Sequence, residues 1–189
     1  MFIQTEETPN PATLKFLPGK TLLSSGTLEF KEKKSAEQNS LAKKLFSEES
    51  VNGVFIGKDF LTVTKSNDVN WDDLKPTILS LILDFFSSGG EIEESPDKNN
   101  HSKENIKYSK DEKVIVDKIE ELLDERIKPA VAQDGGDISF VKYNKGVVFL
   151  ELRGACSGCP SSTITLKSGI ENMLKYYIPE IDSVEAINQ

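Results

Sequence analysis

A polar stretch at residues 89–108 divides this 189-residue chain and limits the size of any core that it can form. The stretch begins with Gly89 and Gly90 and continues with acidic, amide, serine and proline residues, so it offers almost nothing apolar to bury. The segments on either side are each long enough for one small domain. We therefore predict an N-terminal domain at residues 1–88, a flexible polar linker at 89–108 and a C-terminal domain at 109–189.

The N-terminal segment mixes strand and helix signals. Apolar residues recur four apart in one stretch, where Ser35 and Gln38 have the spacing of a capping box, and a broader apolar stripe follows later. The segment contains neither cysteine nor histidine, so it cannot bind a metal through the usual soft ligands. We predict a small α+β domain with strands at 2–8 and 27–30, a helix at 35–48, a hairpin of 54–56 and 60–64, and a helix at 71–87.

The C-terminal segment predicts the order α-β-β-α-β. Helical spacing over 111–132 stops at Asp134-Gly135-Gly136, where glycine can adopt the left-handed cap. Two β-rich runs, 137–143 and 147–152, are joined by Asn144-Lys145-Gly146, which is a strong hairpin signal. Pro160 lies where a first helical residue is preferred, and 181–187 is typical of a final strand. The predicted fold class is α+β, with two small α+β domains joined by the linker.

Composition excludes several classes of protein. The formal charge is -8, which does not favour binding to nucleic acid or to an anionic membrane surface. The apolar stretch at 78–86 is far shorter than the roughly 20 residues that a membrane span needs. Two cysteines cannot form a disulfide framework, and the N-terminus shows neither a signal nor a transit peptide. These observations predict a cytoplasmic protein, with the mature form of a mitochondrial protein as the alternative, and no nucleic-acid or membrane partners.

Both cysteines lie in Cys156-Ser157-Gly158-Cys159, on the turn between a predicted strand and a predicted helix. Free backbone N–H groups and the positive end of the helix dipole should favour anionic sulfur there. A tetrahedral zinc site or a cubane iron-sulfur cluster normally takes four cysteines, whereas this chain brings two. A four-thiolate site would therefore need a second copy of the chain. Cys156 and Cys159 are the candidate ligands of a metal or cluster.

Three interpretations of the cysteine pair stay open from the residues alone: a shared metal or cluster site, a thioredoxin-like dithiol, and two inert core thiols. A thioredoxin-like site is expected near a βαβ unit in a parallel sheet, whereas the hairpin before this motif implies antiparallel strands. We interpret Asp134-Gly135-Gly136-Asp137 as a helix stop followed by a strand, and not as ligands.

The second half resembles the NifU-like C-terminal domain of the Nfu family of iron-sulfur scaffold and carrier proteins. The first half resembles the N-terminal domain of two-domain Nfu proteins. The segments that carry the resemblance are 5–11 and 14–19 in the first half, and 119–124, 127–129, 134–137, 154–162 and 165–167 in the second. Of these, Gly154 to Ser162, which contains the cysteine pair, is the most specific.

The resemblance implies a non-enzymatic carrier that holds a [4Fe-4S] cluster between two subunits, each giving Cys156 and Cys159. It implies a homodimer when loaded, an upstream assembly scaffold as donor and apo iron-sulfur proteins as recipients, and it leaves open whether a [2Fe-2S] form is also carried. The alternatives are a dithiol oxidoreductase and a zinc-bridged structural dimer. For the N-terminal domain, we hypothesise a role in recipient choice or subunit pairing.

Overall fold

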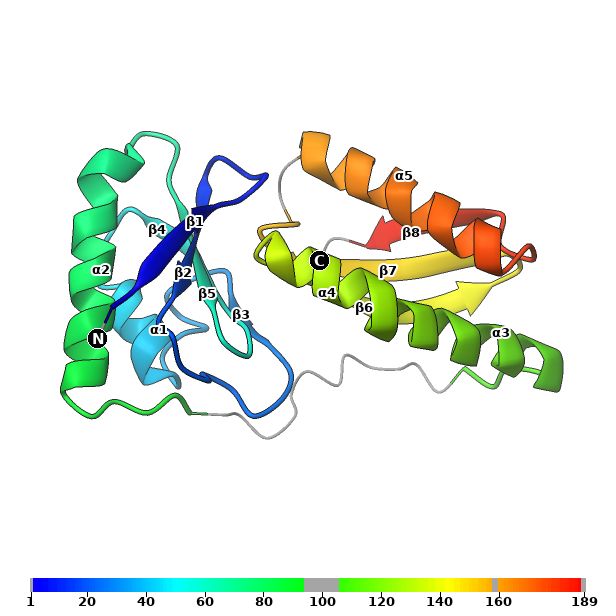
Figure 1. The fold of residues 1–189 in the computed structure, drawn as a ribbon, viewed down its shortest axis with the longest axis horizontal. Coiled ribbons are helices and arrows are strands. Elements are labelled where there is room, and N and C mark those ends of the chain that lie inside the picture. The colour runs from blue at the N-terminus through cyan, green and yellow to red at the C-terminus, as the bar shows by residue number, and fades with distance from the viewer. Residues whose placement is uncertain (1, 94–105, 158–159, 188–189) are drawn as a thin grey trace. The chain divides into compact units, whose positions relative to one another are not determined.

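The computed structural model describes residues 2–93, 106–157 and 160–187, with side chains from 164 onward in the last range. It divides the chain into two compact units, residues 1–99 and 100–189, and each mixes helices with a sheet (Figure 1). The predicted α+β class with two domains is confirmed. Among the residues described, no helix is both long and apolar enough to cross a membrane.

The N-terminal unit is a five-stranded antiparallel sheet with two helices on one face (Figure 1). Its strands lie in the order β1-β2-β5-β4-β3. Buried Phe16, Leu61 and Ile78 belong to the core between sheet and helices. The elements are β1 (Gln4–Glu7), β2 (Thr13–Leu17), β3 (Leu28–Phe30), α1 (Ser40–Leu45), β4 (Val51–Ile56), β5 (Leu61–Lys65) and α2 (Trp71–Ser87).

Two details of this unit differ from prediction. Strand β2 was not predicted, although the alternation of Leu14 and Phe16 just after a proline-rich turn is a hairpin signal. Helix α1 is shorter than the predicted 35–48, and the predicted capping box is wrong, because Asn39 is the N-cap and accepts the Ala42 N–H at 2.9 Å. The Ser35 hydroxyl instead donates to the Glu32 carbonyl in a preceding turn. The helix extends only where the apolar stripe does.

The beginning of the predicted linker contacts the N-terminal unit. Glu93 accepts the Ser40 N–H at 2.8 Å, and its own carbonyl accepts from the Asn39 side chain at 3.3 Å. Burial raises the pKa of Glu93, but the bonds from the Ser40 hydroxyl and N–H outweigh it and leave that pKa below its ordinary value. Ile92 packs against the core. Residues 94–105 of the predicted linker lie outside the described residues, and its last residue, Tyr108, packs against the core of the C-terminal unit.

The C-terminal unit has the predicted order α-β-β-α-β. Its first predicted helix consists of two α-helical parts joined by a π-helical turn. Strands β6 and β7 form the predicted antiparallel hairpin, whereas β8 pairs parallel to β7 (Figure 1). Helix α5 is therefore the crossover of a β7–α5–β8 unit. The elements are α3 (Lys110–Leu122), η1 (Leu123–Ile127), α4 (Lys128–Gln133), β6 (Gly136–Asn144), β7 (Val147–Gly154), α5 (Pro160–Tyr177) and β8 (Ser183–Ile187).

The π-helical turn η1 precedes Pro129 and has a physical reason. Proline has no N–H to donate to the carbonyl four residues earlier, and its ring would press against that carbonyl. The wider turn, in which the Lys128 N–H donates to the Leu123 carbonyl, lets the helix continue past Pro129. The continued helix then ends as predicted, with Asp134 as C-cap and Gly135 in the left-handed region at φ 81°. After this helix end the chain enters β6, whose start lies beside the cysteine turn.

Candidate functional site

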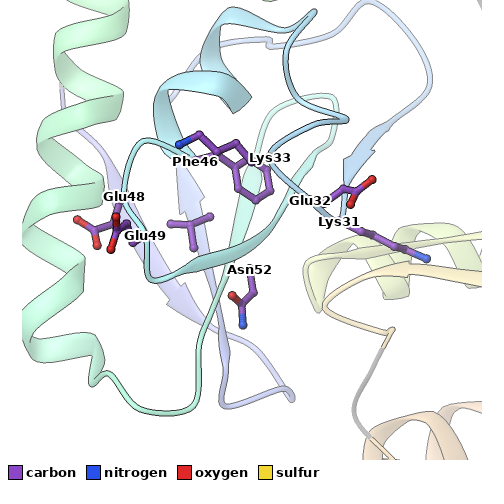
Figure 2. Close-up of a pocket in the computed structure, with 8 residues that line it drawn as sticks. Lys31, Glu32, Lys33, Phe46, Glu48, Glu49 and Asn52 are labelled. Carbon is purple, nitrogen blue, oxygen red and sulfur yellow. The ribbon is translucent and has the colours of Figure 1, made fainter.

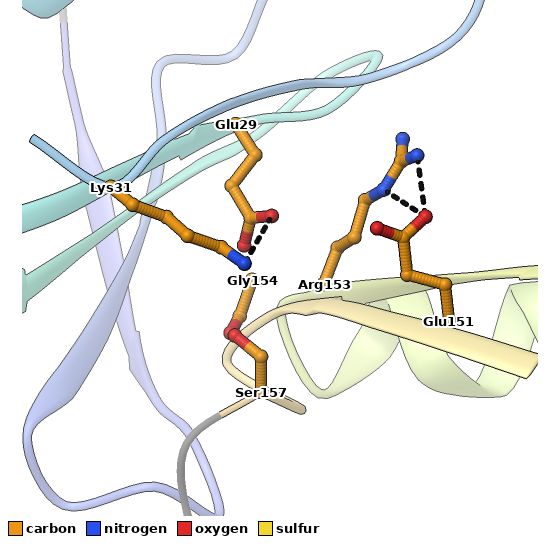
Figure 3. Close-up of polar contacts among 6 residues, drawn as sticks. All are labelled: Glu29, Lys31, Glu151, Arg153, Gly154 and Ser157. Atoms are coloured by element: carbon orange, nitrogen blue, oxygen red, sulfur yellow. Dashed lines mark hydrogen bonds and ion pairs between the residues drawn. The ribbon is translucent and has the colours of Figure 1, made fainter. Parts of the chain in front are cut away.

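Cys156 lies on the turn between the end of β7 at Gly154 and the start of α5 at Pro160. Gly154 has a φ of 63°, which turns the chain out of the strand. Its carbonyl accepts two hydrogen bonds from Ser157, from the N–H at 3.1 Å and from the hydroxyl at 2.9 Å (Figure 3). These bonds fix the turn around Cys156. The other predicted ligand, Cys159, lies outside the described residues.

Gly135 and Gly136, the two glycines that follow α4, contact the turn that contains Cys156. The Gly135 carbonyl accepts the Ala155 N–H at 3.1 Å, and Gly136 is paired with Gly154 across the β6–β7 hairpin. A Cβ placed on Gly136 would lie only 2.5 Å from the Cys156 sulfur. The helix-stop interpretation of this segment is right for Gly135. It missed Gly136, because nothing local in the sequence indicates a contact between residues that lie 20 positions apart.

The surroundings of Cys156 favour the neutral thiol. The residue is 6% exposed and belongs to the core of the C-terminal unit. Burial, followed by the charges of Asp134 and Asp137, raises the pKa of the Cys156 thiol from 9.0 to about 12. The prediction that the turn favours anionic sulfur is therefore wrong for this conformation. Neither the burial of the sulfur nor its closeness to the two carboxylates, which follows from the fold of the α4–β6 junction, is visible in the local sequence around Cys156.

An ion pair stands next to the cysteine turn on β7 (Figure 3). The Arg153 guanidinium donates to one Glu151 oxygen from Nε at 3.2 Å and from Nη2 at 2.8 Å. The two residues are two apart on a strand, so their side chains share a sheet face. Leu150 and Leu152 alternate with them and belong to the core on the opposite face. Sequence reasoning missed this pair, although an opposite-charge i, i+2 pattern within a strand is its signal.

The N-terminal unit contains a pocket of about 390 Å³ but no comparable chemistry (Figure 2). Phe46 and Val51 line it together with charged side chains of both signs. Figure 2 shows these charges spread around the rim and not gathered at one point. Across the part of the chain that the structure describes, no three histidine, cysteine or acidic side chains are grouped so as to hold a metal. Cys156 therefore remains the focus of the candidate site.

Comparison with known proteins decides the family. The family model for the scaffold protein Nfu/NifU N-terminal domain matches residues 3–89, and that for the NifU-like domain matches residues 119–185. The human protein named NFU1 iron-sulfur cluster scaffold homolog, mitochondrial, is 48% identical over 190 residues, which cover 99% of this chain and 72% of that protein. The chain belongs to the Nfu family of iron-sulfur cluster scaffold proteins. The resemblance inferred from the sequence is thus confirmed.

Other relatives extend the comparison for this Nfu-family chain. The Drosophila sechellia protein of the same name is 48% identical over 188 residues, and the chain spans 65% of its length. The solution structure of a NifU-like protein from Saccharomyces cerevisiae is similar with 29% identity and a TM-score of 0.46, over 51% of this chain and 87% of that one.

The predicted cytoplasmic location is wrong. Both the human and the Drosophila sechellia relatives are named mitochondrial. The prediction relied on the absence of a transit-peptide pattern at the start of the given sequence, and these relatives, which are longer than this chain, contradict it.

Proposed function

We propose that this Nfu-family chain is a carrier, not an enzyme, which holds a [4Fe-4S] cluster between two copies and passes it to apo iron-sulfur proteins. The observation that carries the proposal is the ligand count: the chain has two cysteines, and both belong to one Cys-X-X-Cys motif that follows β7 in the sequence. Four thiolates complete such a cluster. Two copies, each giving Cys156 and Cys159, supply that number. The names of the relatives, which describe iron-sulfur cluster scaffolds, support the proposal.

The environment of Cys156 supports release of the cluster as well as binding. The thiol must lose its proton to bind iron, so loading works against the burial and the carboxylates that raise its pKa. Transfer reverses this step. For each Fe–S bond that a recipient thiolate forms, one bond to the carrier breaks, and the released thiolate takes up a proton. The preference of Cys156 for the neutral thiol therefore favours surrender of the cluster to a recipient.

One observation supports the alternative of a dithiol oxidoreductase, and another speaks against it. The parallel pairing of β7 with β8 places the cysteine turn at the start of a crossover helix, so the earlier argument from antiparallel strands does not hold. A dithiol enzyme, however, needs an accessible thiol of low pKa, and Cys156 does not meet this requirement, because it is buried with a pKa of about 12 and would leave Cys159 as the attacking thiol. The chemistry of this sulfur therefore favours the carrier.

Anaerobic reconstitution with iron and sulfide tests the proposal. The expected product is a brown dimer with about four iron and four sulfide per two chains, measured by metal analysis and native mass. Cys156→Ser and Cys159→Ser should each abolish it, whereas Ser168→Ala, a control at an exposed serine of α5 that keeps both thiols, should assemble it. A second incubation with an apo ferredoxin should move the cluster to that recipient. A colourless zinc-containing dimer, or a monomer that forms mixed disulfides, would refute the proposal.

A further inference from the structure

Gly136, the first residue of β6, lies against the sulfur of Cys156 more closely than a side chain would allow. A Cβ on Gly136 would meet the Cys156 sulfur at 2.5 Å, the Arg153 carbonyl oxygen at 2.7 Å and the Cys156 Cβ at 3.1 Å. Real Cβ atoms essentially never approach other heavy atoms to less than 3.0 Å. The sulfur therefore occupies space that exists only because residue 136 has no side chain.

The backbone around Gly136 cannot easily move away. Hydrogen-bonded pairing sets Gly136 opposite Gly154 and Asp137 opposite Arg153 in the β6–β7 hairpin. The bond from the Ala155 N–H to the Gly135 carbonyl holds the following turn to the same segment. An added methyl group would thus displace the sulfur, because a thiol can rotate about one side-chain torsion, and it would also press on the Arg153 carbonyl, which the strand pairing holds in place.

A cluster shared between two copies must meet sulfurs at a surface, whereas Cys156 is 6% exposed. Its sulfur must therefore turn out of this position to bind. We propose that Gly136 is a positioning residue for Cys156, whose missing side chain leaves the space in which the thiol lies covered while no cluster is bound. The purpose of this arrangement rests on the proposed carrier function, but the arrangement itself can be tested without a cluster.

The test measures iodoacetamide alkylation of Cys156 in cluster-free protein, with Cys159→Ser as the background so that one thiol remains. Gly136→Ala should raise the alkylation rate roughly tenfold or more, since an uncovered thiol reacts faster. Gly169→Ala is the matched control, because a Cβ at this exposed position on α5 has nothing within 4 Å, and it should leave the rate unchanged. Equal rates in the Gly136→Ala and parent proteins would overturn the proposal.

A double-mutant cycle separates this effect from simple loosening of the hairpin. Gly136→Ala is made with Cys156 present and with Cys156→Ala, and unfolding by urea is followed by circular dichroism. If the glycine makes room for the sulfur, the substitution should lower the urea midpoint much less, or permit folding, once the sulfur is absent. An equal loss of stability or of folding in both backgrounds would mean that a glycine is needed at residue 136 because of the Arg153 carbonyl and not because of the sulfur. That result would overturn the proposal. Failure of the parent protein to assemble a cluster would refute the carrier function and leave both of these results standing.

Discussion

The high pKa of Cys156 gives a quantitative prediction about its reactivity. At pH 8, an ordinary thiol with a pKa of 9.0 is about 10% thiolate, whereas one at about 12 is about 0.01% thiolate, a thousandfold difference. The logarithm of a thiolate's reaction rate rises with the pKa of its thiol with a slope of about 0.4–0.5. The thiolate of the higher pKa is therefore roughly 20-fold more reactive, which offsets part of the thousandfold difference. Folding should therefore slow the reaction of Cys156 by about 50-fold, before any steric effect of burial is added.

The assay compares one thiol in two states. Cluster-free Cys159→Ser protein is alkylated between pH 7 and 10 in buffer and in denaturing urea, and mass spectrometry follows the modified fraction. The rate in buffer should keep rising with pH throughout this range, because the folded pKa lies above it, whereas the rate in urea should level off near the ordinary value of 9.0. Asp134→Asn and Asp137→Asn should each increase the rate in buffer moderately, because each removes a charge that disfavours thiolate.

Equal rates in buffer and in urea at pH 8, or a rate in buffer that levels off below pH 9, would refute this reasoning. Such a result would mean that the sulfur is exposed or that a nearby positive charge stabilises its thiolate. It would also favour the alternative function of a dithiol oxidoreductase, which requires a reactive thiolate.

Further predictions concern stability. Leu174→Ala removes a fully buried side chain from the C-terminal core and should lower the free energy of unfolding by about 2–5 kcal/mol, measured by urea unfolding with circular dichroism. Asn39→Ala removes the N-cap of α1 and should cost about 1 kcal/mol, measured through the fluorescence of Trp71, the single tryptophan. Bonds from Lys175 and from the Val184 N–H lower the pKa of Glu171, so its contribution to stability is present above its ordinary pKa of 4.5 and is lost as the pH falls through the folded value. Glu171→Gln should therefore reduce the loss of stability between pH 5 and 3, and an unchanged acid profile would contradict this assignment.

Much of the secondary structure could be predicted because its signals are local. The hairpin around Asn144-Lys145-Gly146 and the stop at Gly135 follow from turn residues whose backbone preferences depend little on distant contacts. Helix α1 was predicted too long because its expected capping residue, Ser35, bonds in a preceding turn and Asn39 caps the helix. The π-helical turn before Pro129 escaped prediction because the spacing of apolar residues does not reveal whether a proline will kink a helix or widen one turn.

The sequence by itself determined the division into two small α+β domains, the two-residue spacing of the cysteine pair and the number of thiolates that each chain can give. These depend on composition, spacing and count, all of which can be read along the chain. Only the tertiary structure decided that Cys156 is buried, that Gly136 leaves room for its sulfur, and that β8 runs parallel to β7. Burial and close approach are set by the pairing of β6 with β7 and by the path of α4, which join residues about 20 positions apart. The same contacts explain why this sulfur prefers its proton, which no local pattern predicted.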